Sequence, residues 1–182
     1  MEIFEKTVEK NYVYKGRIIN VRCDKAQLHN GNPCTREVVE HNGGVCIAPI
    51  TENKELIFVR QFRYPYMEMV LELPAGKLEL GEDPFEAGKR ELEEETGTVA
   101  EKYYNLGKFY PTPGYCGEII YLYAASDLKA TAMNPDEDEF LEVEKISIDK
   151  AVEMVLNNEI PDGKTQTLIM RVAEMIRRGM IE

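Results

Sequence analysis

The chain has 182 residues and a formal net charge of −11 at pH 7. A chain of roughly 150–200 residues can bury one sizeable core, so a single core is the default expectation. The negative charge repels the phosphate backbone of nucleic acids, and no basic run with interleaved aromatic residues offsets it, so nucleic acid is not an expected partner. An acidic protein that binds anionic phosphates needs a cation between the two negative charges, and a divalent metal held by carboxylates can fill this role.

Location and redox state follow from what the sequence lacks. The first residues have neither the basic start nor the apolar stretch of a signal peptide, and no apolar run reaches the length of a membrane span. We therefore expect a cytoplasmic protein with no membrane partner. The cysteines show no C-x-x-C pairing and no histidine at zinc spacing, so we interpret them as reduced thiols.

The first half of the chain is predicted to form strands. Residues 12–41 alternate apolar and polar side chains in two runs that break at residues 30–33, which indicates a hairpin appended before the main fold. Residues 43–50 and 55–62 have the apolar, β-branched character of buried strands, and the polar turn between them predicts a second hairpin.

A helix follows a short strand at residues 69–73. The helix is predicted to begin near Pro84, which suits a first helical turn, and to end near Thr96, because Gly97 favours a helix C-terminus. The remaining predicted elements are strands at 103–109, 118–125 and 140–147 and helices at 148–157 and 164–178. Hairpins mixed with helices exclude a purely parallel sheet, so we expect an α+β fold with a mixed central sheet.

The predicted helix carries a cluster of glutamates. Glu91 lies on one helical face with Glu94 and Glu95, which are three and four residues further on. Like charges at this spacing repel, and hard cations such as Mg²⁺ would make the cluster favourable. Arg90 lies one turn before Glu94 and within reach of Glu82, which predicts a scaffolding ion pair. The alternative is an ordinary solvated acidic face.

The spacing of this region resembles the Nudix box. In order it contains Gly76, five residues, Glu82, seven residues, Arg90-Glu91, an apolar residue, any residue, Glu94-Glu95, any residue and Gly97. The one departure is Thr98, which stands where the box usually has an aliphatic residue. The resemblance implies a Nudix fold, an α/β/α sandwich in which the box forms a loop-helix-loop.

Other segments are similar to the ADP-ribose pyrophosphatase branch of that family. They are residues 61–64, residues 72–79 and residues 112–118, the last with Thr112 in place of the serine of a Ser-Pro-Gly element. Residues 136–140 resemble the acidic loop that supplies the catalytic carboxylate. The resemblance extends from about residue 12 to the C-terminus and implies hydrolysis of ADP-ribose to AMP and ribose 5-phosphate.

The resemblance also implies roles for single residues. It gives the general base as Glu137, with Glu139 as the alternative base or a further metal ligand. The metal would be Mg²⁺, with Mn²⁺ as a substitute. Its implied ligands are Glu91, Glu95, Glu94 and the carbonyl of Ala75. The implied substrate contacts are Arg63, Thr112, Pro113, Gly114 and Glu118, with Arg36 and Glu37 as weaker candidates for the nucleoside.

Several alternatives remain open at this point. The substrate can be another nucleoside diphosphate sugar such as GDP-mannose, or an oxidised nucleotide. Alternatively, the chain can be a catalytically inactive Nudix-like module that binds ADP-ribose or a related metabolite as a regulatory ligand. We expect residues 1–42 to form the β extension and residues 43–182 the catalytic domain. In the resembled branch such extensions exchange between subunits, so a homodimer is expected, although an antiparallel hairpin can equally cover its own domain.

Overall fold

The computed structural model describes residues 3–135 and 140–181. The chain divides into two compact units, the first formed by Met1–Gly43 with Tyr110–Ile119 and the second by Gly44–Phe109 with Ile120–Glu182. In the described parts of the chain, every helix is too short or too polar to cross a membrane.

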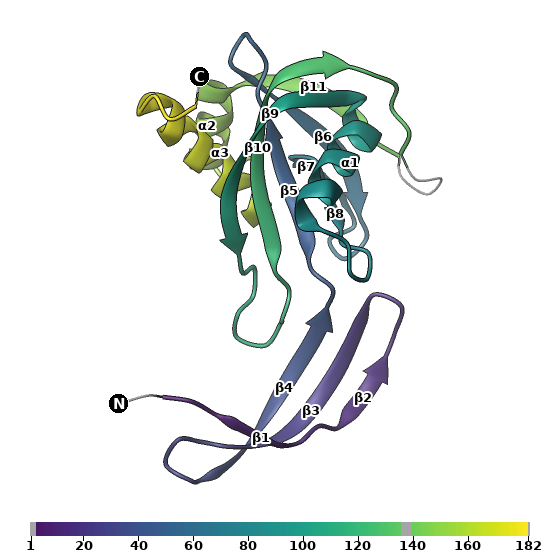
Figure 1. The fold of residues 1–182 in the computed structure, drawn as a ribbon, viewed down its shortest axis with the longest axis vertical. Coiled ribbons are helices and arrows are strands. Elements are labelled where there is room, and N and C mark those ends of the chain that lie inside the picture. Colours follow the sequence, from purple (N-terminus) through teal and green to yellow (C-terminus); the bar gives the residue numbers. More distant parts are fainter. Residues whose placement is uncertain (1–2, 136–139, 182) are drawn as a thin grey trace. The chain divides into compact units, whose positions relative to one another are not determined.

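The first unit is an antiparallel sheet built around one long strand, β3 (Ile19–Gln27). It pairs along its whole length with β4 (Pro33–His41), and its other edge is shared by β1 (Lys6–Glu9) and β2 (Tyr12–Lys15) (Figure 1). The turn between β3 and β4 contains Gly31 at φ +85°, a conformation that glycine adopts without strain. The predicted first hairpin is therefore present, but its first run is split into β2 and β3, and β1 was not predicted.

The second unit contains a mixed four-stranded sheet in the order β8-β5-β10-β9. Its strands are β5 (Gly44–Pro49), β8 (Ala75–Lys77), β9 (Thr98–Phe109) and β10 (Ile120–Ala130). β5 and β10 are parallel, and the other two pairs are antiparallel. A second, antiparallel sheet has the order β11-β6-β7, formed by β6 (Glu55–Arg63), β7 (Glu68–Glu72) and β11 (Glu142–Ser147).

The prediction that residues 43–50 and 55–62 pair as a hairpin is wrong. β5 and β6 both form, but they belong to different sheets and are joined only by an isolated bridge between Ile50 and Leu56 among the described residues. A polar turn reverses the chain without deciding which neighbour the next strand pairs with, and β6 finds its partners in β7 and β11.

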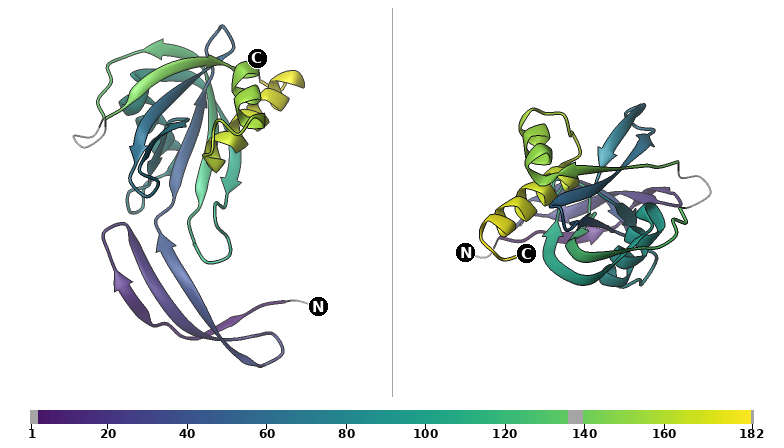
Figure 2. Two further views of the ribbon diagram at one scale, coloured as in Figure 1. Left: turned by 180° about the vertical axis from the view of Figure 1, so that it is seen from behind. Right: turned by 90° about the horizontal axis from the view of Figure 1, so that it is seen from above.

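Helices cover both faces of the mixed sheet (Figure 2). α1 (Pro84–Thr96) packs on one face over a cluster that includes Val45, Ile47 and Leu92. α3 (Gly163–Arg177) packs on the other face, where Cys46 and Ala48 join a larger cluster with α2 (Ile148–Leu156) and the second sheet. Successive residues of β5 thus face opposite layers, as the two-residue period of a strand requires. The predicted mixed sheet between helices is confirmed.

Candidate functional site

α1 begins and ends where its capping residues place it. The side chain of Asp83 accepts hydrogen bonds from the backbone N–H groups of Phe85 and Glu86, and Pro84 occupies the first turn. Gly97 ends the helix in the left-handed conformation at φ 59°, and its N–H donates to the carbonyl of Glu93. These fixed ends determine which side chains of α1 face the sheet.

Two glutamates of α1 point inward against β8. Glu91 and Glu95 lie one helical turn apart and are 7% and 1% exposed. The N–H of Ala75 donates to Oε2 of Glu95 at 3.0 Å. A Cβ added to Gly76 would lie 1.8 Å from Oε1 of Glu91, so only a glycine leaves room for that carboxylate. The two buried carboxylates therefore meet the backbone at one corner of the second unit.

Arg90 holds the start of the box against the helix. Its Nε and Nη2 donate to Glu82 at 3.1 and 3.3 Å, and its Nη1 lies 2.8 Å from Oε2 of Glu94 and 2.9 Å from Oε1 of Glu91. Burial opposes the charge of Arg90, but the hydrogen bonds and charges of these glutamates outweigh it and raise its pKa. The ion pair expected between Arg90 and Glu82 is present. Glu82 also accepts the N–H of Glu79, which fixes the loop.

The oxygen donors at this corner suit a hard cation. Glu91 and Glu95 supply carboxylate oxygens, and β8 supplies backbone carbonyls, which are the ligand types that Mg²⁺ prefers. Glu94 is turned toward Arg90. Over residues 3–135 and 140–181, no three acidic, histidine or cysteine side chains are already gathered around one point as metal ligands. The absence of a side chain at Gly76 is the local feature that admits the Glu91 carboxylate.

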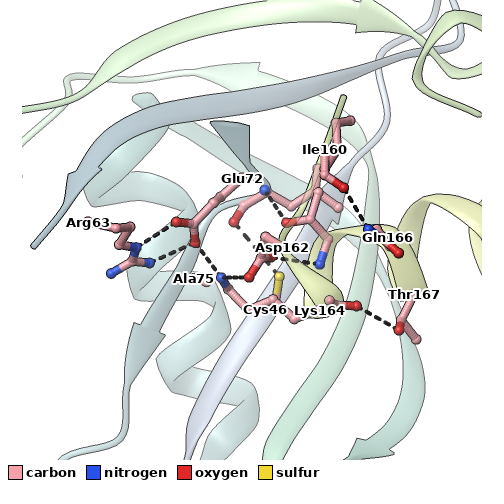
Figure 3. A network of polar contacts seen from close by, with 12 residues as sticks. Cys46, Arg63, Glu72, Ala75, Ile160, Asp162, Lys164, Gln166 and Thr167 are labelled. Atoms are coloured by element: carbon pink, nitrogen blue, oxygen red, sulfur yellow. Dashed lines mark hydrogen bonds and ion pairs between the residues drawn. The ribbon is translucent and has the colours of Figure 1, made fainter. Parts of the chain in front are cut away.

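A second group of charges lies beside this corner, at Arg63 and Glu72 (Figure 3). Arg63, at the end of β6, donates from Nε and Nη2 to the two oxygens of Glu72 at 2.5 and 2.7 Å. The Glu72 side chain is 1% exposed and also receives the ammonium group of Lys164 from α3. Burial raises the pKa of Glu72, but the two cations outweigh burial and lower it.

Sequence reasoning named Arg63 but missed Glu72 and Lys164 as a buried pair. The two residues are 92 positions apart, so no local spacing connects them. One signal was available, because Glu72 is the single charged residue in the apolar run of residues 69–73. A buried glutamate in such a run needs a cationic partner.

The remaining predicted substrate contacts belong to the first unit. Arg36 and Glu37 lie on β4, where Arg36 donates to both oxygens of Glu5 at 2.8 and 2.6 Å and Glu37 is exposed. Glu118 lies 3.4 Å from Nδ1 of His41. The segment with Thr112, Pro113 and Gly114 turns back on itself, because the carbonyl of Thr112 accepts the N–H of Cys116 at 3.0 Å.

The backbone of this segment pairs with β4 at Val39. The N–H of Val39 donates to the carbonyl of Tyr115 at 2.8 Å, and the N–H of Gly117 donates to the carbonyl of Val39 at 2.9 Å. Residues 110–119 thus extend the sheet of the first unit at Val39. The candidate bases Glu137 and Glu139 lie outside the residues that the structure describes.

Comparisons with known proteins add to this geometry. The family model described as "NUDIX domain" matches residues 40–166, and the model described as "Nucleoside diphosphate sugar hydrolase N-terminal domain" matches residues 5–39. An ADP-ribose pyrophosphatase of Bacillus subtilis (strain 168) is 39% identical over 163 residues, which cover 88% of this chain and 88% of that protein. A methanol dehydrogenase activator of Bacillus methanolicus is 40% identical with the same coverage.

A similar fold is also present among solved structures. The crystal structure of an ADP compounds hydrolase has a TM-score of 0.84 and 22% sequence identity, and the match covers 97% of each chain. At this level of identity the likeness shows the fold alone.

Proposed function

Because the chain belongs to the Nudix family and is a hydrolase of pyrophosphate bonds, we propose that it cleaves ADP-ribose to AMP and ribose 5-phosphate in a reaction that depends on Mg²⁺. The observation that carries the proposal is the placement of the Glu91 and Glu95 carboxylates at the Ala75–Gly76 backbone. Arg90 already lies beside Glu91, and the carboxylate and carbonyl oxygens at this corner are the ligand types that Mg²⁺ prefers.

The residues that would hold the ion are Glu91, Glu95, Glu94 and the carbonyl of Ala75. When bound, Mg²⁺ supplies a Lewis acid for the phosphate oxygens and lowers the pKa of a bound water. Arg90 keeps the loop before α1 in place through Glu82. We assign the removal of a proton from the attacking water to Glu137, with Glu139 as the alternative base. Mn²⁺ is expected to substitute for Mg²⁺.

Support for ADP-ribose comes from the relatives and from the N-terminal strands. The Bacillus subtilis relative bears the name of an ADP-ribose pyrophosphatase, and residues 5–39 match a domain of nucleoside diphosphate sugar hydrolases. We assign the diphosphoribose contacts to Arg63, Glu118 and residues 112–114. We assign weaker nucleoside contacts to Arg36 and Glu37, of which Arg36 would have to release Glu5.

We also propose that the protein is a homodimer. The first unit exposes large apolar side chains, including Phe4 before β1 at 60%, Val8 on β1 at 65% and Val13 on β2 at 60%. Exposed large apolar side chains in so small a unit are typical of a surface that another chain covers. A second copy of this chain is the partner that the proposal names.

A panel of substrates tests the proposed activity. ADP-ribose, GDP-mannose and flavin adenine dinucleotide are incubated with the protein side by side, with Mg²⁺ and with EDTA, and the products are separated by ion-exchange chromatography. We expect AMP and ribose 5-phosphate from ADP-ribose at the highest kcat/KM, and only with the metal. Faster release of GMP from GDP-mannose would assign the chain to another nucleoside diphosphate sugar, and equal rates in EDTA would contradict the metal requirement.

A further inference from the structure

Glu72 has two cationic partners that differ in their exposure to solvent. The Lys164 side chain is 12% exposed, whereas the Arg63 side chain is 37% exposed. Lys164 is further enclosed by Asp162, whose Oδ1 lies 3.0 Å from its ammonium group. Burial lowers the pKa of Lys164, but the neighbouring Cys46 and the carboxylates of Glu72 and Asp162 outweigh burial and raise it. Lys164 therefore stays charged at neutral pH, where the two carboxylates are its counter-ions and the buried Cys46 thiol is neutral.

The segment that bears Glu72 continues directly to Ala75 and Gly76, where the backbone meets the Glu91 and Glu95 carboxylates. The N–H of Leu73 donates to Oγ1 of Thr165 at 2.9 Å, the carbonyl of Pro74 accepts the N–H of Ile47 at 2.9 Å, and the N–H of Ala75 donates to Glu95. Figure 3 shows the first turn of α3 and the Glu72–Ala75 segment side by side. The backbone that joins Glu72 to Ala75 is therefore fixed to α3, β5 and α1 in turn.

Arg63 is placed to contact an anion at the corner. Arg63 is bonded to Glu72, which precedes Ala75 by three residues, and Figure 3 shows the three residues together. The hydrogen bonds to Glu72 are the main cause of the raised pKa of Arg63, and the charge of Glu95 adds to it. Glu72 engages Nε and Nη2 of Arg63 and leaves Nη1 for another acceptor. A guanidinium that is one-third exposed can turn toward a phosphate group, and its planar fork fits phosphate oxygens as well as it fits a carboxylate.

We propose that Lys164 is the permanent counter-ion of Glu72 and that Arg63 is an exchangeable one. When substrate binds, the Arg63 guanidinium releases the Glu72 carboxylate and bonds to a phosphate group of the substrate. Lys164 is then a positioning residue. It neutralises the buried Glu72 carboxylate while Arg63 is bonded to the phosphate. Without Lys164, release of Arg63 would leave the Glu72 carboxylate buried with no counter-ion, which is energetically costly. The inference rests on the proposed function, since it takes a diphosphate as the ligand of Arg63.

Binding of inorganic pyrophosphate measured by titration calorimetry in MgCl₂ tests the inference without turnover. We expect Arg63→Met to raise the Kd, and Lys164→Met to raise it by about tenfold or more, because Arg63 is then held by Glu72. The double variant Glu72→Gln/Lys164→Met removes both buried charges and frees Arg63, so its Kd should return to within about twofold of the wild-type value. Lys164→Arg keeps a cation and should stay near wild type.

The matched control is Lys150→Met on α2, whose lysine is 53% exposed and pairs with Glu153 at 3.6 Å. It should leave the Kd unchanged. In steady-state assays of ADP-ribose, Lys164→Met should raise KM by about tenfold with little change in kcat, as expected when ground-state binding is lost. A merely structural lysine would lower the amount of folded protein and leave the KM of that protein unchanged.

Four results would overturn the inference, and three of them concern the variants. They are a pyrophosphate Kd that Arg63→Met leaves unchanged, a Kd that Lys164→Met leaves unchanged, and a double variant that binds as weakly as Lys164→Met. A wild-type protein that binds no pyrophosphate would also overturn it. Failure to hydrolyse any nucleoside diphosphate, combined with the expected binding series, would instead reject the proposed function and leave this inference standing.

Discussion

Gly76 and Glu91 are in such close contact that no other residue fits at position 76, because an added Cβ would lie 1.8 Å from Oε1 of the glutamate. The contact is between backbone and the end of a side chain, so a methyl group would displace the carboxylate and leave β8 in place. The first glycine of the Nudix box is therefore needed because it leaves room for a carboxylate, whereas the glutamates of the box are needed for their charge.

Gly76→Ala is predicted to reduce hydrolysis of ADP-ribose by about 10–100-fold, the range seen when a group that orients a metal ligand is lost. The physical reason is the displacement of Glu91 from the corner. Steady-state kinetics over a range of Mg²⁺ concentrations measures the effect. Gly163→Ala is the control, since its added Cβ meets only Phe109 at 3.8 Å. Equal activity of the two variants would contradict the steric account.

Glu95→Gln is predicted to fold normally and to lose several orders of magnitude in turnover, since metal and base act as a unit. The amide keeps the size of the side chain and an oxygen that can accept the N–H of Ala75. Circular dichroism checks the fold, and calorimetric titration with Mg²⁺ checks metal binding separately from activity. Glu86→Gln, an exposed glutamate of the same helix, is the control. Unchanged turnover in Glu95→Gln would refute the metal assignment.

Arg90→Lys is predicted to lower kcat although the charge is kept. A single ammonium group cannot bond Glu82 and Glu94 together as Nε, Nη1 and Nη2 of the arginine do. Arg90 is one-third exposed, so the loss of stability should be small, about 1 kcal/mol or less. Urea unfolding and kcat are measured on the same samples. A large stability loss with kcat intact would mean that the pair serves the fold alone.

The stability of the protein should depend on pH through Glu72. Its pKa in the folded protein lies below its ordinary value of 4.5, because Arg63 and Lys164 outweigh burial. A depressed carboxylate pKa stabilises the fold above the ordinary value, and this contribution is lost as the pH falls toward the folded value. Urea midpoints from pH 7 to pH 3 should therefore fall more steeply for wild type than for Glu72→Gln/Lys164→Met. Parallel curves would contradict this.

The proposed dimer predicts a mass of two chains in light scattering behind a sizing column. Val8→Asp with Val13→Asp places charges on the exposed apolar sheet and should shift the protein to the mass of one chain, because a charge is costly at an apolar interface. Lys150→Asp on α2 serves as a surface control. A wild-type mass of one chain would also weaken the nucleoside contacts assigned to Arg36 and Glu37.

The sequence was most informative where a single helix and its caps carry the signal. Pro84, Thr96 and Gly97 mark the ends of α1 where they were predicted, because capping is local chemistry. The face shared by Glu91 and Glu95 follows from helical spacing alone. The three residues of β8 were missed, because so short a strand is defined by its pairing with β5 rather than by its own composition.

The remaining features depend on contacts that are distant in sequence. β6 was expected beside β5 but forms a sheet with β7 and β11, and β11 is contributed by residues more than eighty positions away. Likewise, the partners of Glu72 come from β6 and from α3. A pattern along the chain identifies a charged residue in an apolar strand, but only the tertiary fold decides which cation reaches it.

β5 supplies consecutive side chains to two separate hydrophobic clusters, with Val45 and Ile47 in one and Cys46 and Ala48 in the other. Exchanging one of these side chains for another of similar volume alters a single layer. Deleting or inserting one residue would instead turn every later side chain of the strand to the wrong layer at once. Homologous chains should therefore differ in length in their surface turns and keep an uninterrupted strand at Gly44–Pro49.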